Sequence, residues 1–143
     1  MSNLNQHQLS STTINTENLS LEASQSLART VAEAADDKKA GEIVLLQVAE
    51  VSYLTDYFVI VTGFSRAQVR AIAESIEEKV ELDCQRQPLR VEGKTDAGWI
   101  LIDYGDVIVH IFLPTEREYY NLEAFWGHAQ RIEFQSAKDS VGI

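Results

Sequence analysis

The turn Gly63-Phe64-Ser65 is the first place where residue types and spacing could do chemistry. It lies where an apolar run gives way to a helical pattern. Backbone amides and the positive end of a helix dipole at such a turn can hold a phosphate group. The structural alternative is that Gly63 makes the turn and Ser65 caps the helix, with Gln68 reaching back. No Walker motif and no G-x-G-x-x-G motif supports phosphate binding.

The second candidate is the pair Asp103 and Asp106, which flanks Tyr104-Gly105 between two apolar runs. Paired carboxylates can bind Mg²⁺ or share acid–base catalysis. Aspartate is also common at hairpin tips, where it accepts backbone hydrogen bonds, and exposed carboxylates there can dock a partner. Because no further ligands converge on the pair, we expect neither a metal nor another cofactor.

Histidine and cysteine complete the reactive side chains. His110 stands in an apolar run, where a lone histidine is usually a hydrogen-bonded structural residue. No Ser-His-Asp or Cys-His arrangement can be assembled from the spacing. Cys84 is the only cysteine, which excludes an intrachain disulfide and a cysteine-built zinc site. We therefore expect that the chain is not an enzyme.

Charge and composition narrow the class of partner. The 143 residues suit one domain, and 45% of them are apolar, so the chain can bury a core. Its 12 Lys and Arg and 22 Asp and Glu give a net charge of −10. Nucleic acids and anionic membranes attract cationic surfaces, so we expect no direct DNA binding and no membrane association. Acidity suits a basic protein partner, although it can also serve solubility alone.

The location follows from what the sequence lacks. No apolar run approaches the roughly 18 residues of a spanning helix. The start has neither the basic and apolar regions of a signal peptide nor the arginine-rich character of a transit peptide. We expect a cytoplasmic protein.

The elements that must position these residues form one domain between two polar ends. Residues 1–19 predict a disordered polar extension, residues 20–134 the domain, and residues 135–143 a flexible tail. Hydrophobic periodicity and turn residues predict helices at 20–39, 65–84 and 115–126 and strands at 43–48, 57–62, 89–91, 99–102 and 107–112.

This order of elements predicts an α/β fold of three layers, with a mixed five-stranded sheet flanked by helices. The connection between strands 43–48 and 57–62 is too short for a helical crossover, so they should pair antiparallel. Strand 89–91 follows Pro88 and should lie at an edge. Gly41 is the expected C-cap of the first helix, and Thr115 with Glu118 the capping box of the last.

Aromatic residues gather in the C-terminal part. Trp99 opens a strand just after a polar loop, and Tyr119, Tyr120, Phe125 and Trp126 crowd one helix. Core packing accounts for most of them. Large rings at a strand start or a last helical turn are often partly exposed, and Trp and Tyr commonly anchor protein interfaces.

Several segments together resemble a known family, the ribosomal silencing factors, also called the Iojap family. The resemblance covers about residues 22–126. The segments that carry it, in the family's order and spacing, are Asp56-Tyr57-Phe58-Val59-Ile60, Thr62-Gly63-Phe64-Ser65, Glu92-Gly93, the block from Trp99 to His110, and Arg117-Glu118-Tyr119-Tyr120-Asn121-Leu122-Glu123.

The resemblance implies a translational repressor. Members bind large-subunit ribosomal protein fourteen and sterically block joining of the small subunit, which lowers translation when nutrients are limited. They are often homodimers when free. Carried over position by position, the partner-binding residues are Trp99, Ile102, Asp103, Tyr104 and Asp106, with Glu92, Arg117, Tyr120 and Glu123 at the rim.

The family fold also resembles the nucleotidyltransferases, whose two metals are held by an Asp-x-Asp pair on the strand after the Gly-Ser turn. Strand 89–91 here reads Leu-Arg-Val. We therefore expect a nucleotidyltransferase-like fold without its catalytic carboxylates, because nothing on that strand could hold the metals. Two alternatives stay open: a large-subunit assembly factor, and a residual nucleotide-binding enzyme that uses the Gly63-Phe64-Ser65 turn.

Overall fold

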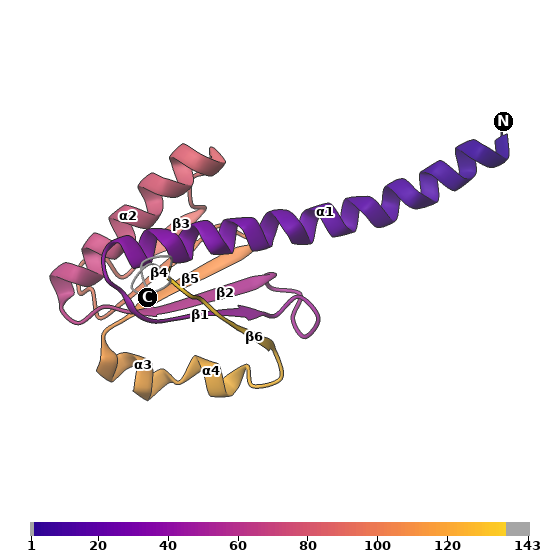
Figure 1. Cartoon of the computed structure of the whole chain (residues 1–143). Helices are drawn as coiled ribbons and strands as arrows, with labels where there is room; N and C mark the ends of the chain where they lie inside the picture. The colour runs from indigo at the N-terminus through magenta and orange to yellow at the C-terminus, as the bar shows by residue number, and fades with distance from the viewer. Residues whose placement is uncertain (1, 137–143) are drawn as a thin grey trace, which may run out of the picture.

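The computed structural model describes residues 2–136, with side chains from residue 19 onward, as three layers (Figure 1). A sheet lies between two long helices on one side and two short helices on the other. The elements in chain order are α1 (Ser2–Asp37), β1 (Gly41–Gln47), β2 (Tyr57–Thr62), α2 (Arg66–Cys84), β3 (Arg90–Glu92), β4 (Trp99–Asp103), β5 (Val107–Phe112), α3 (Pro114–Tyr120), α4 (Leu122–Phe125) and β6 (Gln130–Glu133).

The sheet has the order β3-β4-β5-β2-β1-β6. This confirms the mixed three-layer α/β class, but the expected count of five strands is wrong. The sixth strand, β6, pairs antiparallel with β1 and reads Gln-Arg-Ile-Glu, in which only Ile132 is apolar. So short and polar a segment carries no strand pattern, and pairing with β1 is what makes it a strand.

The two central strands, β2 and β5, run parallel, and each is buried along its whole length. β2 is apolar up to Thr62 and β5 is apolar apart from His110, as expected for strands buried on both faces. The other pairings are antiparallel, including β1 with β2, as expected from their short connection. β3 lies at one edge, also as expected.

Two apolar cores cover the two faces of the sheet. α1 and α2 lie on the first face, where residues such as Val31, Val69 and Ile72 pack against the inward side chains of the strands. On the second face, a smaller core is built around Phe58 and Phe112, and α4 lies against part of it. The first face is closed by long helices, whereas the second is covered incompletely.

α1 differs from its expected bounds at both ends. It begins at Ser2, before the expected start at residue 20, and its first part projects beyond the sheet (Figure 1). It ends at Asp37, where Lys39 takes the left-handed conformation at φ 61°, while Gly41 already belongs to β1. The C-cap expected at Gly41 is therefore wrong. Within residues 2–136, no helix is both long and apolar enough to cross a bilayer.

Most of the predicted tail at 135–143 lies outside the described residues. The proposed division of the chain at residues 19 and 134 stays a prediction.

The two predicted capping boxes have different outcomes. Ser65 is the N-cap of α2, and its Oγ accepts a hydrogen bond from the backbone N–H of Gln68 at 3.0 Å. The Gln68 side chain reaches back to the backbone N–H of Phe64 at 2.7 Å. In α3, by contrast, Pro114 takes the first helical position, so Leu113 is the N-cap, and its apolar side chain makes no cap bond. The capping box expected at Thr115 is wrong.

The expected final helix is also interrupted. Asn121 takes the left-handed conformation at φ 45° and divides the segment into α3 and the four-residue α4. Asparagine tolerates this conformation better than most residues, so the chain can turn here and place α4 against the second face.

Replacing Ser65 with Ala should lower the free energy of unfolding by about 1 kcal/mol, because the amide of Gln68 loses its acceptor. Urea denaturation measures the change. Ser65→Asp restores an acceptor and should recover most of the loss, and an equal loss in both variants would show that the cap contributes little.

Candidate functional site

The second face of the sheet is centred on a pair of rings from β4 and β5. Trp99 Nε1 donates a hydrogen bond to His110 Nδ1 at 3.1 Å, which confirms that His110 is a hydrogen-bonded structural residue. Phe58 meets the imidazole edge-on with ring centroids 5.2 Å apart, and Phe112 stacks on it at 6.0 Å. Trp99 also packs against Tyr120 of α3, with centroids 4.5 Å apart.

This geometry fixes the protonation of His110. Burial lowers the pKa of its imidazole to about 4, so the ring is neutral at pH 7. The indole N–H can only donate, so Nδ1 must accept and the imidazole proton resides on Nε2. That Nε2 is buried and has no hydrogen-bond partner among the described residues.

Beside these rings the second face is hollowed. The hollow measures about 420 Å³. Leu54 and Leu89 on its rim are 66% and 75% exposed, and Tyr120 nearby is 47% exposed. Exposed apolar side chains that gather around a hollow mark a candidate binding site, whereas scattered ones do not. The hollow is lined by Leu54, Phe58, Leu89, Arg90, Trp99, Leu101, Asp103, Gly105, Ile108, His110, Leu122 and Trp126.

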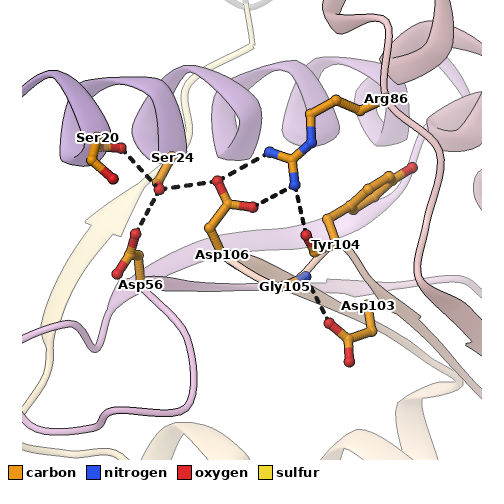
Figure 2. A network of polar contacts seen from close by, with 8 residues as sticks. All are labelled: Ser20, Ser24, Asp56, Arg86, Asp103, Tyr104, Gly105 and Asp106. Carbon is orange, nitrogen blue, oxygen red and sulfur yellow. Dashed lines mark hydrogen bonds and ion pairs between the residues drawn. The ribbon is translucent and has the colours of Figure 1, made fainter.

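The turn between β4 and β5 separates its two carboxylates. Asp103 lies on the side of the hollow, where its Oδ1 accepts a hydrogen bond from the Gly105 backbone N–H at 2.8 Å (Figure 2). Its Oδ2 accepts a hydrogen bond from Arg90 Nε at 3.2 Å. Asp106 instead contacts α1. The two side chains therefore do not converge on one ligand. Within residues 19–136 no group of three acidic, His or Cys residues is arranged to hold a metal.

Asp106 joins three segments of the fold (Figure 2). Arg86 donates to both of its oxygens, at 3.1 and 2.8 Å, and to the Tyr104 carbonyl. Burial alone would raise the pKa of Asp106, but the hydrogen bonds and charge of Arg86 and the hydroxyl of Ser24 hold it below its usual value. These contacts fasten the segment after α2 and the middle of α1 to the start of β5.

A second carboxylate shares the Ser24 hydroxyl. Ser24 Oγ lies 2.6 Å from an oxygen of Asp56 and 3.1 Å from one of Asp106. A hydroxyl has one proton to donate, so Ser24 can donate to only one of the two carboxylates at a time. The two aspartates precede the parallel strands β2 and β5, whose register places Tyr57 beside Val107.

Arg117 is a buried clamp beneath the short helices. Its Nε donates to Glu123 at 2.9 Å, and its Nη1 donates to the Glu42 carbonyl at 2.6 Å and to Thr62 Oγ1 at 2.9 Å. Glu123 also receives a 2.9 Å hydrogen bond from Arg131 of β6. The clamp therefore ties α3, α4, β1 and β2 together, and Arg131 connects β6 to it.

The predicted partner-binding residues divide into three groups. Trp99 and Asp103 line the hollow. Tyr120 and Glu92 are exposed, and they contact Trp99 and Arg90 of its lining. Ile102 and Tyr104 point into the first core, at 0% and 1% exposed, so in this conformation their side chains are not available to a partner. The remaining three, Asp106, Arg117 and Glu123, are committed to the internal contacts described above.

Sequence reasoning missed Ser24 and Arg86, the two partners of Asp106. One available signal was that Asp56 and Asp106 each directly precede an apolar strand, and parallel neighbours bring such positions to the same edge of a sheet. Ser24 and Arg86 carry no signal of their own, because a serine within a helix and an arginine after one are ordinary surface residues.

The turn at Gly63 is occupied internally. The Gly63 N–H donates to the Phe112 carbonyl at 2.9 Å, and the Phe64 N–H to Gln68 Oε1 at 2.7 Å. A phosphate would have to displace these bonds, so the geometry favours the structural interpretation of this turn.

Comparison with known proteins identifies the family. The family described as "Ribosomal silencing factor during starvation" matches residues 21–142. The chain belongs to this family. The ribosomal silencing factor of Halalkalibacterium halodurans is 42% identical over 113 residues, which cover 79% of this chain and 96% of that protein.

Two further family relatives broaden the comparison. A mouse protein called "Mitochondrial assembly of ribosomal large subunit protein 1" is 34% identical over 91 residues, which cover 66% of this chain and 40% of that one. A crystal structure from Chromobacterium violaceum superimposes with a TM-score of 0.70 at 34% identity, and covers 79% of this chain and 92% of that one. The silencing-factor fold is therefore shared across the described domain.

In this silencing-factor chain, Arg117→Met should lower the free energy of unfolding by about 3 kcal/mol, because buried acceptors lose their donor. Arg131→Met is the matched control. Both arginines bind Glu123 at 2.9 Å, but Arg131 is 48% exposed in its side chain, so its loss should cost about 0.5 kcal/mol or less. Thermal or urea unfolding measures both, and equal losses would contradict the clamp.

The free energy of unfolding of this chain should also depend on pH through His110. Its pKa is lowered from 6.5 to about 4 by burial, so the folded state binds fewer protons than the unfolded state between these values. Stability is therefore complete above pH 6.5 and falls toward pH 4, with a slope approaching about 1.4 kcal/mol per pH unit.

His110→Gln keeps an acceptor for Trp99 without titrating and should flatten this slope in urea titrations. Asp106 does not interfere, because its lowered pKa places its contribution below about pH 3.8. An unchanged slope in the variant would assign the pH dependence to other groups.

Proposed function

We propose that the chain is a translational repressor that binds the large ribosomal subunit and sterically blocks joining of the small subunit, lowering translation in nutrient limitation. The observation that carries the proposal is the family match over residues 21–142. The name of the mouse relative, which refers to assembly of the ribosomal large subunit, supports the same subunit as the partner.

Within the large subunit, the proposed partner is ribosomal protein fourteen, as the family resemblance implies. The docking surface, defined as Trp99, Asp103, Tyr120, Glu92, Leu54 and Leu89, combines exposed apolar groups with carboxylates. Aromatic anchors within a polar rim are typical of protein interfaces. The net charge of −10 favours encounter with a basic protein.

Repression by occupancy of a surface requires no chemical reaction, so we propose that the chain is not an enzyme and uses no cofactor. A contact of roughly 1,200–2,000 Å² of buried surface is enough for a specific complex. The proposed free form is a cytoplasmic homodimer, in which a second copy could cover the exposed rings until the ribosome replaces it.

A second candidate function is large-subunit assembly, favoured by the name of the mouse relative. Sucrose-gradient sedimentation distinguishes the two functions. Added to mature subunits, a silencing factor reduces the fraction of whole ribosomes, whereas a factor that acts only during maturation leaves it unchanged.

Trp99→Ala should weaken binding to isolated ribosomal protein fourteen by more than about 1 kcal/mol, because it removes the central anchor. Titration calorimetry gives the affinity, and circular dichroism verifies that the variant is folded. Leu82→Ala is the control, since Leu82 is an apolar residue of α2, 76% exposed and outside the proposed surface. A folded Trp99→Ala variant that binds with full affinity would refute this surface.

A further inference from the structure

Trp99 belongs to the proposed docking surface, yet it offers a partner no polar atom. The only polar group of an indole side chain is its N–H, which donates one hydrogen bond. In Trp99 this group already donates to His110 Nδ1 at 3.1 Å. Because His110 is only 5% exposed, the N–H edge of the indole is directed toward the interior of the domain. The part of the half-buried ring that reaches the surface is therefore hydrocarbon.

The neighbouring rings alone do not determine this orientation. Trp99 packs against Phe112 and Tyr120, with ring centroids 5.0 and 4.5 Å apart. Such contacts depend on the faces and edges of the rings, and an indole rotated by half a turn about its Cβ–Cγ bond still presents a face to both neighbours. The hydrogen bond distinguishes the two orientations, because only one of them brings the N–H to its acceptor on His110.

His110 is an unfavourable residue for this position if stability is its only role. Its Nε2–H is buried and has no acceptor among the described residues. A buried donor without a partner lowers the free energy of unfolding, and an apolar side chain of similar size, such as leucine, avoids this cost. What leucine lacks is an acceptor for the indole of Trp99.

Loss of this acceptor has a specific consequence for the surface. An indole N–H that stays buried without a partner loses its hydration and gains nothing in return. Trp99 is only half-buried, so a rotation of its ring exposes the N–H to water. Water then supplies the missing acceptor, and the fold keeps most of its stability. The surface that a partner meets changes, because a polar edge replaces hydrocarbon.

We propose that His110 is a positioning residue for docking: its Nδ1 holds the N–H edge of Trp99 inward, so that the hydrocarbon part of the indole faces an apolar group of the partner. His110 is buried and acts through Trp99, without touching the partner itself. The role in docking rests on the proposed function, whereas the orientation of the ring does not.

Hydrogen exchange of the indole N–H, followed by nuclear magnetic resonance, tests the orientation. The chain has two tryptophans, and the Trp99 signal is the one lost in Trp99→Phe. In His110→Leu this N–H should exchange with water at least about tenfold faster than in the wild-type chain, because its acceptor is gone. His110→Asn keeps an oxygen acceptor near the position of Nδ1 and should restore slow exchange. Equal rates in all three chains would overturn the proposal.

The same two variants should rank in opposite order for stability and for docking. At neutral pH, His110→Leu removes the unpaired Nε2–H and should keep the urea midpoint of the wild type, whereas His110→Asn buries an amide with an unpaired N–H and should unfold at lower urea. Affinity for purified large subunits should follow the acceptor instead. We expect about tenfold weaker binding for His110→Leu and a change within about twofold for His110→Asn.

An affinity that follows the urea midpoint would show that His110 acts through stability alone and would overturn the proposal. If His110→Leu does not fold, the other two chains still decide. A Trp99 N–H that exchanges as fast as a free indole in the wild type, or a tenfold loss of affinity in folded His110→Asn, would equally overturn it.

A double-mutant comparison connects the effect to Trp99. In the Trp99→Phe background there is no N–H to orient, so adding His110→Leu should leave the affinity of that background nearly unchanged. A further tenfold loss there would give His110 a role independent of Trp99 and contradict the proposal. If the wild-type chain does not retain large subunits, the proposed function fails and the role in docking fails with it, whereas the exchange rates still decide whether His110 holds the ring.

Discussion

The parallel pairing of β2 and β5 is the constraint on which the rest of the structure depends. Two parallel neighbours must be joined by a long connection, and here that connection contains α2, β3 and β4. Both strands are buried on both faces, so helices have to cover each side of the sheet. The same pairing brings Asp56 and Asp106 to one edge, where Ser24 and Arg86 fasten α1 and the end of α2 to them.

The two faces of the sheet are completed by different means. On the first face, long helices bury a continuous apolar core, and a few buried polar contacts fix their position. On the second face, the short helices cover only part of the sheet and are held by the Arg117 clamp. The first face is therefore closed, whereas the second is left partly open at the hollow.

The sequence predicted the elements whose own residues determine their structure. β2 and β5 are mostly apolar, and Ser65 with Gln68 forms a capping box, so the two strands and the start of α2 could be recognised from the sequence alone. β6 could not, because Gln130–Glu133 becomes a strand only by pairing with β1. The division between α3 and α4 depends on the backbone of Asn121, which a helical pattern of aromatic residues conceals.

The candidate site was predictable in part for the same reason. Trp99 and Asp103, two of the residues that the resemblance named, line the hollow. Ile102 and Tyr104 belong to the same segment but alternate onto the opposite face, as successive residues of a strand must. A motif taken as one continuous segment does not show which residues share a face of the sheet. The alternation of side chains along a strand does show it.

The edges of the sheet carry a further consequence. An unpaired strand edge is a template on which other chains can add strands and aggregate. At one end β6 occupies the hydrogen-bonding edge of β1, and at the other β3 is only three residues long and bears Arg90 and Glu92. The outermost strands are thus short and charged, which discourages sheet-to-sheet growth while leaving the apolar hollow, on the face rather than the rim, free for recognition.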